Sequence, residues 1–298
     1  MPSELPGRVA AKLLRHRAGT AAFCTLTYKL ETLYKVMQIL FRAFLAIYLA
    51  HLLTDFVFQT HRLVEQKRRG KLLAYFFHGL THYLSAVILV SFFLAGSGLW
   101  LRTYFDLLAL TLVHLLIDFA KTHFKAFLNG DALAFVVDQF LHFLSVAAAA
   151  WLLAPGLPFA GVIVLLGMGR AVPSKLLFIP VIYIGVIFGG GYLIRALTRP
   201  LAESVKLYPP EKHGEPMQNA GLYIGWLERF LLLTALLLQS PGTTGLILAA
   251  KAIARYPEFK SEHFAEYFLI GTLLSFSIAV LGGAVLARVV LGQFHVSG

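Results

Sequence analysis

Cysteine and charged residues are both scarce in this sequence. Its 298 residues include one cysteine, Cys24, which excludes an intramolecular disulfide and a cysteine-rich metal site. Charged residues make up 14% of the chain, against about 25% in soluble globular proteins. Hydrophobic residues make up 58%, more than a globule of this size can hide from water. A soluble enzyme, a disordered protein and a fibrous repeat are therefore excluded.

The chain also lacks the short motifs of several enzyme classes. No Gly-x-Ser-x-Gly motif, Walker motif or Cys–His nucleophile arrangement occurs in it. Its 26 Lys and Arg exceed its 15 Asp and Glu, and in so apolar a chain this excess is typical of loops that face anionic headgroups. We therefore expect membrane lipids as partners and no nucleic acid.

Apolar runs long enough to cross a membrane recur along the chain. A helix of about 20 residues crosses a hydrocarbon core of about 30 Å. We predict an all-α integral membrane helical bundle with about seven spans and one or two shorter helices. The predicted spans are residues 36–58, 72–95, 103–122, 132–153, 175–197, 219–239 and 264–288. The shorter runs are residues 157–168 and 243–255.

Polar segments divide the chain into four regions. These are a basic N-terminal extension (1–36), a transmembrane bundle (37–197), a polar linker (198–218) and C-terminal transmembrane helices (219–298). Lys and Arg gather in the loops at 59–71 and 119–131, beside the linker and around 251–263, which predicts that these segments face the cytoplasm.

The N-terminal extension contradicts this charge pattern. It is basic, yet the parity of the spans places it on the opposite side of the membrane. One hypothesis is that translation begins at Met37, so that the extension is not native. The alternative is a basic surface helix that does not set the topology.

Four consecutive predicted spans each carry two ionisable side chains four residues apart. Four residues make just over one helical turn, so each pair lies on one helix face. All four pairs lie toward the same end of their spans, the end with most Lys and Arg. The sequence therefore predicts one layer near the cytoplasmic side. Its members are His51 and Asp55, His78 and His82, His114 and Asp118, and Asp138 and His142.

Such a layer needs something to compensate its carboxylates. A central Asp in a membrane costs about 2.5–3.5 kcal/mol on the scale derived from insertion experiments. Paired His and Asp on facing helices are how bundles build metal sites, and this donor set suits zinc, manganese or iron. We predict that these eight residues hold one or two divalent ions. The alternative is that they only hydrogen-bond and ion-pair with one another.

An internal repeat relates the first two pairs to the last two. The segment HLLTDF at 51–56 matches HLLIDF at 114–119, and HYLS at 82–85 matches HFLS at 142–145. This pattern predicts a duplicated helical hairpin whose copies face each other across the site. Gln59 and Gln139 are weaker supporting candidates. Ser85 and Ser145 could hydrogen-bond beside the ligands or bond a backbone carbonyl, and we favour the carbonyl. His61 and His123 are expected at the surface.

A second polar set occurs in the C-terminal helices, which carry Glu228, Arg229, Lys251, Arg255 and Glu266. One interpretation is a structural ion-pair network between helices. The other is that Lys251 and Arg255 bind substrate, as a cationic clamp for a phosphate or carboxylate headgroup.

These segments resemble a bacterial membrane protein family known as domain of unknown function 3307. The resemblance covers residues 37–280 and implies a multi-pass protein of the bacterial inner membrane, without implying an activity. It rests on AHLLTDFVFQ (50–59), HGLTH (78–82), HLLID (114–118), DQFLH (138–142), YIGWLERF (223–230), AAKAIAR (249–255) and AEYFLIGTLL (265–274).

Four functions compete at this point. We favour a metal-dependent hydrolase that acts on a lipid or lipid-linked phosphate near the cytoplasmic leaflet, with Asp55 or Asp138 as general base where it is not a ligand. A divalent cation transporter is the main alternative. A di-iron oxidase or hydroxylase would need more histidines, and a purely structural protein would need no metal.

Overall fold

The computed structural model describes residues 20–95, 101–124, 130–153, 175–204, 220–260 and 262–291. All regular structure in these ranges is helical, which confirms the predicted all-α class. The elements are α2 (Thr20–Leu52), η1 (Leu53–Phe58), α3 (His61–Arg68), α4 (Leu72–Phe93), α5 (Leu101–Phe124), α6 (Asp131–Leu152), α8 (Lys175–Ile184), η3 (Gly185–Gly189), α9 (Gly190–Ser204), α10 (Ala220–Leu237), α11 (Pro241–Ala254), η5 (Tyr256–Lys260) and α12 (Glu262–Leu291).

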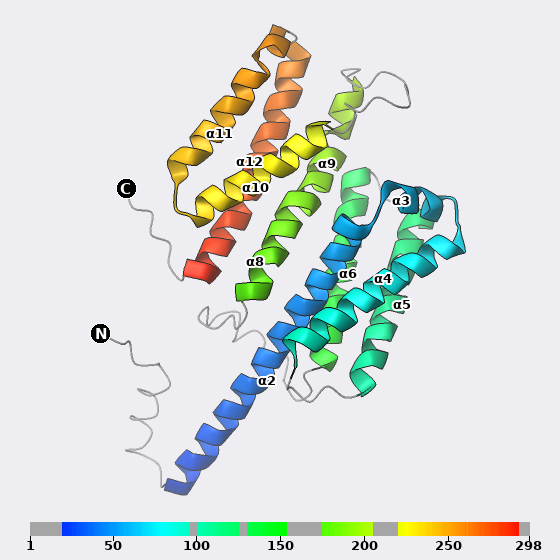
Figure 1. Ribbon diagram of the computed structural model, residues 1–298, viewed down its shortest axis with the longest axis vertical. Coiled ribbons are helices and arrows are strands. Elements are labelled where there is room, and N and C mark those ends of the chain that lie inside the picture. The colour runs from blue at the N-terminus through cyan, green and yellow to red at the C-terminus, as the bar shows by residue number, and fades with distance from the viewer. Residues whose placement is uncertain are drawn as a thin grey trace.

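Six helical stretches within the described ranges are long and apolar enough to cross a membrane, which indicates a multi-pass membrane protein. They are Tyr34–Phe58, Leu72–Phe93, Leu101–His123, Asp131–Leu152, Lys175–Ala202 and Phe264–Leu291. The sequence predicts about seven. The difference is the run at 219–239, which forms α10, a helix of 18 residues that carries Glu228 and Arg229. Both of these charged residues are buried against protein, and α10 lies obliquely across its neighbours (Figure 1).

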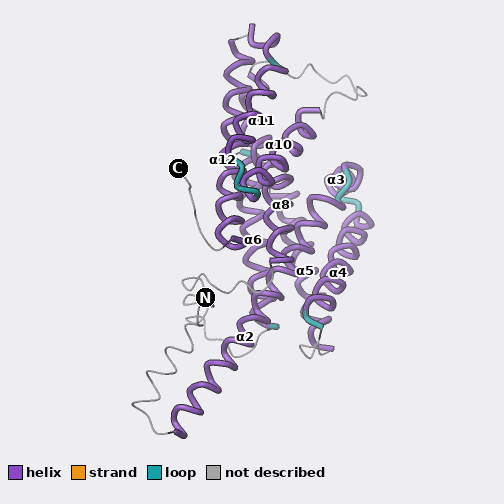
Figure 2. Tube along the Cα trace, turned by 60° about the vertical axis from the view of Figure 1, so that its left-hand side comes forward, coloured by secondary structure: helices purple, strands orange, loops and turns teal. Residues whose placement is uncertain are grey.

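Two predicted boundaries move. Helix α2 begins at Thr20, so the second half of the expected N-terminal extension continues into the first span as one helix, which projects beyond the bundle (Figures 1 and 2). Helix α9 continues through Ser204, past the predicted linker start at 198, and Arg199 Nη1 in this extension donates to Asp131 Oδ2 of α6 at 2.6 Å. The rest of the linker, residues 1–19 and the run at 157–168 lie outside the described residues.

Helices α2, α4, α5 and α6 close into a ring. Helix α2 packs against α4 and α6, and α5 packs against the same two helices. The helices with matching sequences, α2 with α5 and α4 with α6, are therefore diagonally opposite. Side chains that point into this ring come from both predicted hairpins.

Small residues allow these helices to approach closely. Ala43, Ala46 and Ala50 of α2 have no exposed surface. Gly79 of α4 faces α5 so closely that an added Cβ would lie 2.7 Å from Leu115 Cδ1. Small residues at such contacts are typical of helix packing in membranes, where backbones must come together without a hydrophobic driving force.

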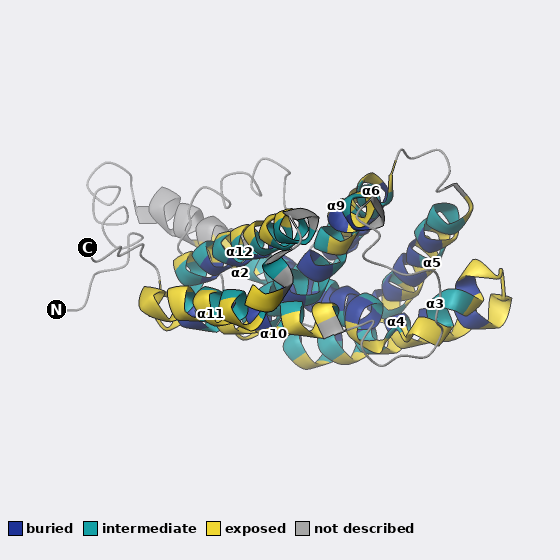
Figure 3. Cartoon of the chain, turned by 90° about the horizontal axis from the view of Figure 1, so that it is seen from above, coloured by how far each residue is buried: buried dark blue, intermediate teal, exposed yellow. Residues whose placement is uncertain are grey.

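The outer helix faces are apolar and exposed. Leu72 is 79% exposed and Phe92 is 70% exposed, on a helix whose buried residues face the ring. Exposed residues cover the outward faces of α4, α10 and α11, while buried residues lie between helices (Figure 3). Lipid is the solvent that suits such a surface.

The basic segments lie toward one end of the molecule. Helix α3, the last turn of α9 and the α11–α12 connection lie toward the end opposite the N-terminus of α2 (Figure 1). This grouping agrees with the charge pattern of the sequence. That this end faces the cytoplasm stays a prediction.

Candidate metal centre

The His/Asp layer predicted from the sequence forms inside the ring. Each of the four helical segments contributes its pair: α2 with η1, then α4, α5 and α6. The side chain of Asp55 is 10% exposed, and the other seven residues are buried. Helical periodicity therefore placed all eight side chains on inward faces.

A π-helix carries Asp55. Element η1 begins at Leu53, two residues after His51, and its wider turn is of the kind often found at functional sites. Thr54 Oγ1 donates to Ala50 O at 2.8 Å across the transition from α2. Phe56, the next residue after Asp55, stacks on Tyr192 of α9 with ring centroids 5.7 Å apart. The π-helical turn is thus anchored by a contact of Thr54, just before Asp55, and by a contact of Phe56, just after it.

Asp55 lies at the centre of a group with His51, His114 and His142. Its Oδ2 is 3.7 Å from His51 Nδ1 and 3.9 Å from His142 Nε2, and its Oδ1 is 3.4 Å from His114 Nε2. The candidate ligand atoms of the four residues all lie within 4.8 Å of one another. An ion bound tetrahedrally at about 2.0–2.2 Å separates its ligand atoms by a similar distance, roughly 3.3–3.6 Å.

Several atoms of this group lack hydrogen bonds. Both ring nitrogens of His51, both of His142 and Oδ1 of Asp55 are buried with no hydrogen-bond partner among the described residues. Buried polar atoms are nearly always bonded, and each unbonded one costs about 1–3 kcal/mol. A bound cation would satisfy nitrogen lone pairs and carboxylate oxygens together.

Two further groups share residues with the first. His78, His114 and Asp118 form one, in which His78 Nε2 lies 2.9 Å from His114 Nε2 and 3.2 Å from Asp118 Oδ2. Asp118, Asp138 and His142 form the other. Seven of the eight predicted ligands therefore belong to at least one group whose spacing suits an ion.

His82 belongs to none of these groups. Its ring stacks on His114 with centroids 4.2 Å apart, and its Nδ1 lies 3.2 Å from Thr111 Oγ1. The structure thus packs His82, a predicted ligand, against His114, which does belong to candidate metal-binding groups.

Lys67 and Lys121 are the residues that sequence reasoning missed. Lys67 Nζ of α3 donates to Asp118 Oδ2 at 2.5 Å, and Lys121 Nζ of α5 donates to Asp138 Oδ2 at 2.7 Å. From the sequence alone, both lysines belong to basic loops whose predicted role is to set the orientation of the chain in the membrane. For Lys121 a signal existed, because it follows Asp118 by three residues and so shares its helix face. For Lys67, on a short separate helix, no spacing could reveal the contact.

The weaker predictions are mostly confirmed. Gln59 Nε2 lies 3.5 Å from His78 Nδ1, and Gln139 Nε2 donates to Asp138 Oδ2 at 3.1 Å. Ser145 Oγ donates to the backbone carbonyl of His142. His61 and His123 are exposed.

The charges of the layer nearly balance. Three carboxylates and two lysine ammonium groups leave a net charge of −1 when the imidazoles are neutral. One divalent ion changes this to +1, whereas two ions would give +3 in a buried site. Asp118 and Asp138 already have lysine partners, but among the described residues no lysine pairs with Asp55. Charge therefore favours one ion, beside Asp55.

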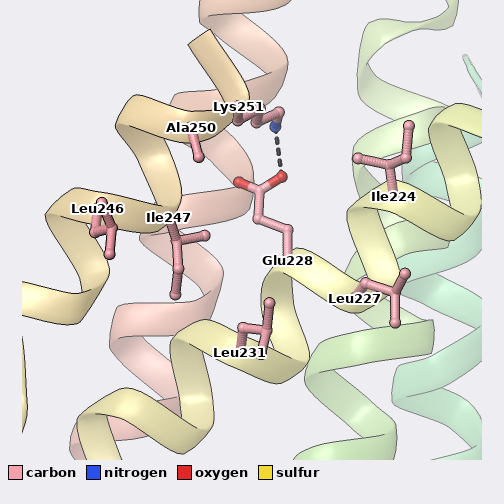
Figure 4. A pocket seen from close by; sticks show the side chains of 8 residues that line it. All are labelled: Ile224, Leu227, Glu228, Leu231, Leu246, Ile247, Ala250 and Lys251. Atoms are coloured by element: carbon pink, nitrogen blue, oxygen red, sulfur yellow. Dashed lines mark hydrogen bonds and ion pairs between the residues drawn. The ribbon is translucent and has the colours of Figure 1, made fainter. Parts of the chain in front are cut away.

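The C-terminal polar set lies in another part of the fold. Lys251 Nζ donates to Glu228 Oε2 at 2.5 Å in a groove lined mostly by leucine and isoleucine (Figure 4). Arg229 is buried and donates from Nε and Nη2 to Ile187 O of η3 at 3.1 and 2.8 Å. These contacts have the form of a structural network. Helix α11 carries Lys251 and ends at Ala254, just before Arg255, and it packs against α10 and η5 rather than against the helices of the His/Asp layer.

The fold and the site together define a multi-pass helical membrane protein with a buried His/Asp cluster that could hold a metal ion. Residues 43–159 match the model of a family described as Protein of unknown function (DUF3307). The match contains all four His/Asp pairs and confirms the resemblance there, but it does not reach the C-terminal motifs. No curated protein and no solved structure matches the chain.

Proposed function

We propose that this protein binds one divalent metal ion inside the membrane through His51, Asp55, His114 and His142. The observation that carries the proposal is the set of buried, unbonded ring nitrogens and carboxylate oxygen in this group. Three imidazoles and one carboxylate are donors that suit zinc, manganese or iron. The ion would also remove the unpaired negative charge of Asp55.

We further propose that the bound ion makes the protein a hydrolase for a lipid or lipid-linked phosphate. A divalent ion polarises a phosphoryl oxygen and lowers the pKa of a bound water. Four protein ligands complete a tetrahedron, so the ion would take a water or substrate oxygen as a fifth ligand. With Asp55 as a ligand, Asp138 remains the candidate general base, since its Oδ1 is buried with no hydrogen-bond partner in the described chain.

The location of the site supports a membrane substrate. The layer lies inside the ring of candidate spans, toward the end where the basic segments gather (Figure 1). We place that end at the cytoplasmic leaflet of a bacterial inner membrane. Because Glu228 already pairs with Lys251, the proposal gives Lys251 and Arg255 no role in holding a headgroup.

Metal content tests the first step. Protein purified in detergent and analysed by elemental analysis should hold one equivalent of zinc, manganese or iron. His51→Ala and His142→Ala should lose it, while Asp138→Asn, which changes a residue paired with lysine, should retain it. A metal-free wild-type protein would contradict the proposal.

Hydrolysis tests the second step. Metal-loaded protein should release phosphate from a lipid phosphate ester, and His142→Ala should not. Protein that holds its ion but hydrolyses no lipid phosphate ester with zinc or manganese supplied would remove the hydrolase and leave the metal site.

A divalent cation transporter is the alternative function. The observation that favours it is that the ligands come from both hairpins of the repeat, with α2 and α5 diagonally opposite in the ring. Transporters often bind their ions between two repeats. Metal uptake into proteoliposomes that is lost in His142→Ala would make transport the function.

A further inference from the structure

We infer that the metal-loaded site binds a phosphate-type oxyanion, and that Lys67 and Lys121 are its protein donors. This inference rests on the proposed metal site and names the ligand class that the site would take. The observation behind it is that Lys67 pairs with Asp118 and Lys121 pairs with Asp138. These two carboxylates lie next to the group that would hold the ion.

Charge gives the first argument. Asp55, Asp118 and Asp138 with Lys67 and Lys121 leave −1, so a single divalent ion leaves the loaded layer at +1. An uncompensated charge is costly in a buried site. One monoanionic group beside the ion would bring the layer to neutrality, and a phosphodiester, a singly protonated phosphomonoester or dihydrogen phosphate carries that charge.

The lysines have the geometry that an anion needs. An ammonium group has three N–H donors, and the ion pair with Asp118 or Asp138 uses one of them. Both carboxylates belong to the group that also contains His142, a ligand of the proposed ion. Each lysine therefore pairs with a carboxylate that lies within 4.8 Å of His142, and we infer that their remaining N–H donors bind an oxyanion held by the ion.

Exposure shows where an anion could enter. The Lys67 side chain is 9% exposed, whereas the Lys121 side chain is 39% exposed beside Asp138, which is 2% exposed. Of the two lysines, Lys121 is thus the more exposed, and its ammonium group links the buried Asp138 to the protein surface. A lysine there can meet an anion before the anion reaches the metal.

The sequence repeat adds an independent argument. Asp55 and Asp118 occupy equivalent positions in the two copies, yet Asp118 has a lysine partner and Asp55 has none in the described chain. Two carboxylates that only helped the helices to pack would have no need of this difference. This difference instead divides the layer into two parts. Asp55 lies where the metal ion would bind, whereas Asp118 and Asp138 lie where the lysines supply N–H donors.

Cobalt substitution tests the inference without an activity assay. Full-length protein in detergent is loaded with Co²⁺, its cobalt content is measured, and its visible absorption is followed during titration with inorganic phosphate. We expect a saturable change of the spectrum in the wild type. Lys121→Met should weaken phosphate binding at least roughly tenfold at full cobalt content, because a charged donor is lost. Lys121→Arg should retain most of the affinity.

Matched variants separate this effect from general damage. Arg69→Met removes an exposed charge of the same region, one that pairs with Glu65 at 3.0 Å, and should leave phosphate affinity unchanged. Lys67→Met combined with Asp118→Asn removes the buried ion pair without leaving a bare carboxylate. This double variant should fold, bind cobalt and bind phosphate more weakly.

The source of the anion is tested with the same spectrum in nanodiscs. Phosphatidylglycerol added to a neutral galactolipid should change the spectrum if the anion is a lipid headgroup, whereas a response to inorganic phosphate alone would identify a soluble phosphate. Full cobalt content with no response to either, or with equal phosphate affinity in wild type and Lys121→Met, would overturn the inference. Wild-type protein that binds no metal would instead overturn the proposed function.

Discussion

Lys67 joins α3 to the membrane-spanning helix α5 through a 2.5 Å contact between its Nζ and Oδ2 of Asp118. Both side chains are 9% exposed, so the pair is removed from water. His78 Nε2 lies 3.2 Å from the same carboxylate oxygen. A short helix is thereby fixed to the His/Asp layer by one buried ion pair.

The first prediction concerns this pair. Lys67→Met should lower stability by about 3–5 kcal/mol, because it leaves the Asp118 carboxylate buried without its partner. Adding Asp118→Asn should recover much of the loss. Thermal unfolding in detergent measures both effects, and Arg69→Met, in an exposed pair worth about 0–1 kcal/mol, is the control. Equal unfolding temperatures for Lys67→Met and wild type would contradict the prediction.

The second prediction distinguishes ligands from neighbours within the layer. His114→Ala should lose most of its bound metal, because the substitution removes one of the four proposed ligands. His82→Ala should keep its metal, because His82 stacks on His114 and contacts Thr111. Elemental analysis of the two proteins in parallel checks this, and equal metal loss in both would refute it.

The third prediction tests the close approach of α4 and α5. Gly79→Val should separate these helices, since even a Cβ at position 79 would lie 2.7 Å from Leu115 Cδ1. Overpacking of this kind costs about 1–3 kcal/mol. The shift should also lengthen the His78–His114 contact and reduce metal retention during dialysis.

Leu115→Ala provides the rescue for that variant. Combined with Gly79→Val, it makes room for the added side chain and should restore metal retention. Failure of the rescue, with the protein still folded, would show that the glycine matters for a reason other than space.

The fourth prediction separates the C-terminal helices from the metal centre. Arg229→Met should lower the unfolding temperature, because Ile187 O in the π-helix η3 loses two charged donors, each worth about 1.5–3 kcal/mol. Metal content should stay at the wild-type value, since Arg229 touches no residue of the layer. Loss of metal without loss of stability would be the contrary result.

The sequence was most informative where helical periodicity operates. Pairs such as His114 and Asp118 repeat at four residues within apolar runs, and this spacing alone predicts an inward-facing layer. Periodicity could not predict that His82 would turn to Thr111, because a pair fixes a helix face and not the direction in which each ring points.

The remaining differences come from tertiary contacts. Lys67 lies on a separate helix, so its pairing with Asp118 depends on how α3 folds back. The run at 219–239 was counted as a span by its hydropathy, although Glu228 and Arg229 make their contacts with α11 and η3. Asp55 was placed on an α-helix, and the π-turn that carries it has no signature in the residues themselves.

Phe56 gives the bound ion a mechanical reach beyond its ligands. It adjoins Asp55 in the chain and its ring rests on Tyr192, while an added Cβ on Gly189 of η3 would touch the same ring. Any movement of the carboxylate as it grips a cation is therefore passed to a helix of the other half. If the His/Asp layer binds an ion, its loading should therefore alter the packing of Tyr192 and η3, which lie outside the four helices that supply the layer.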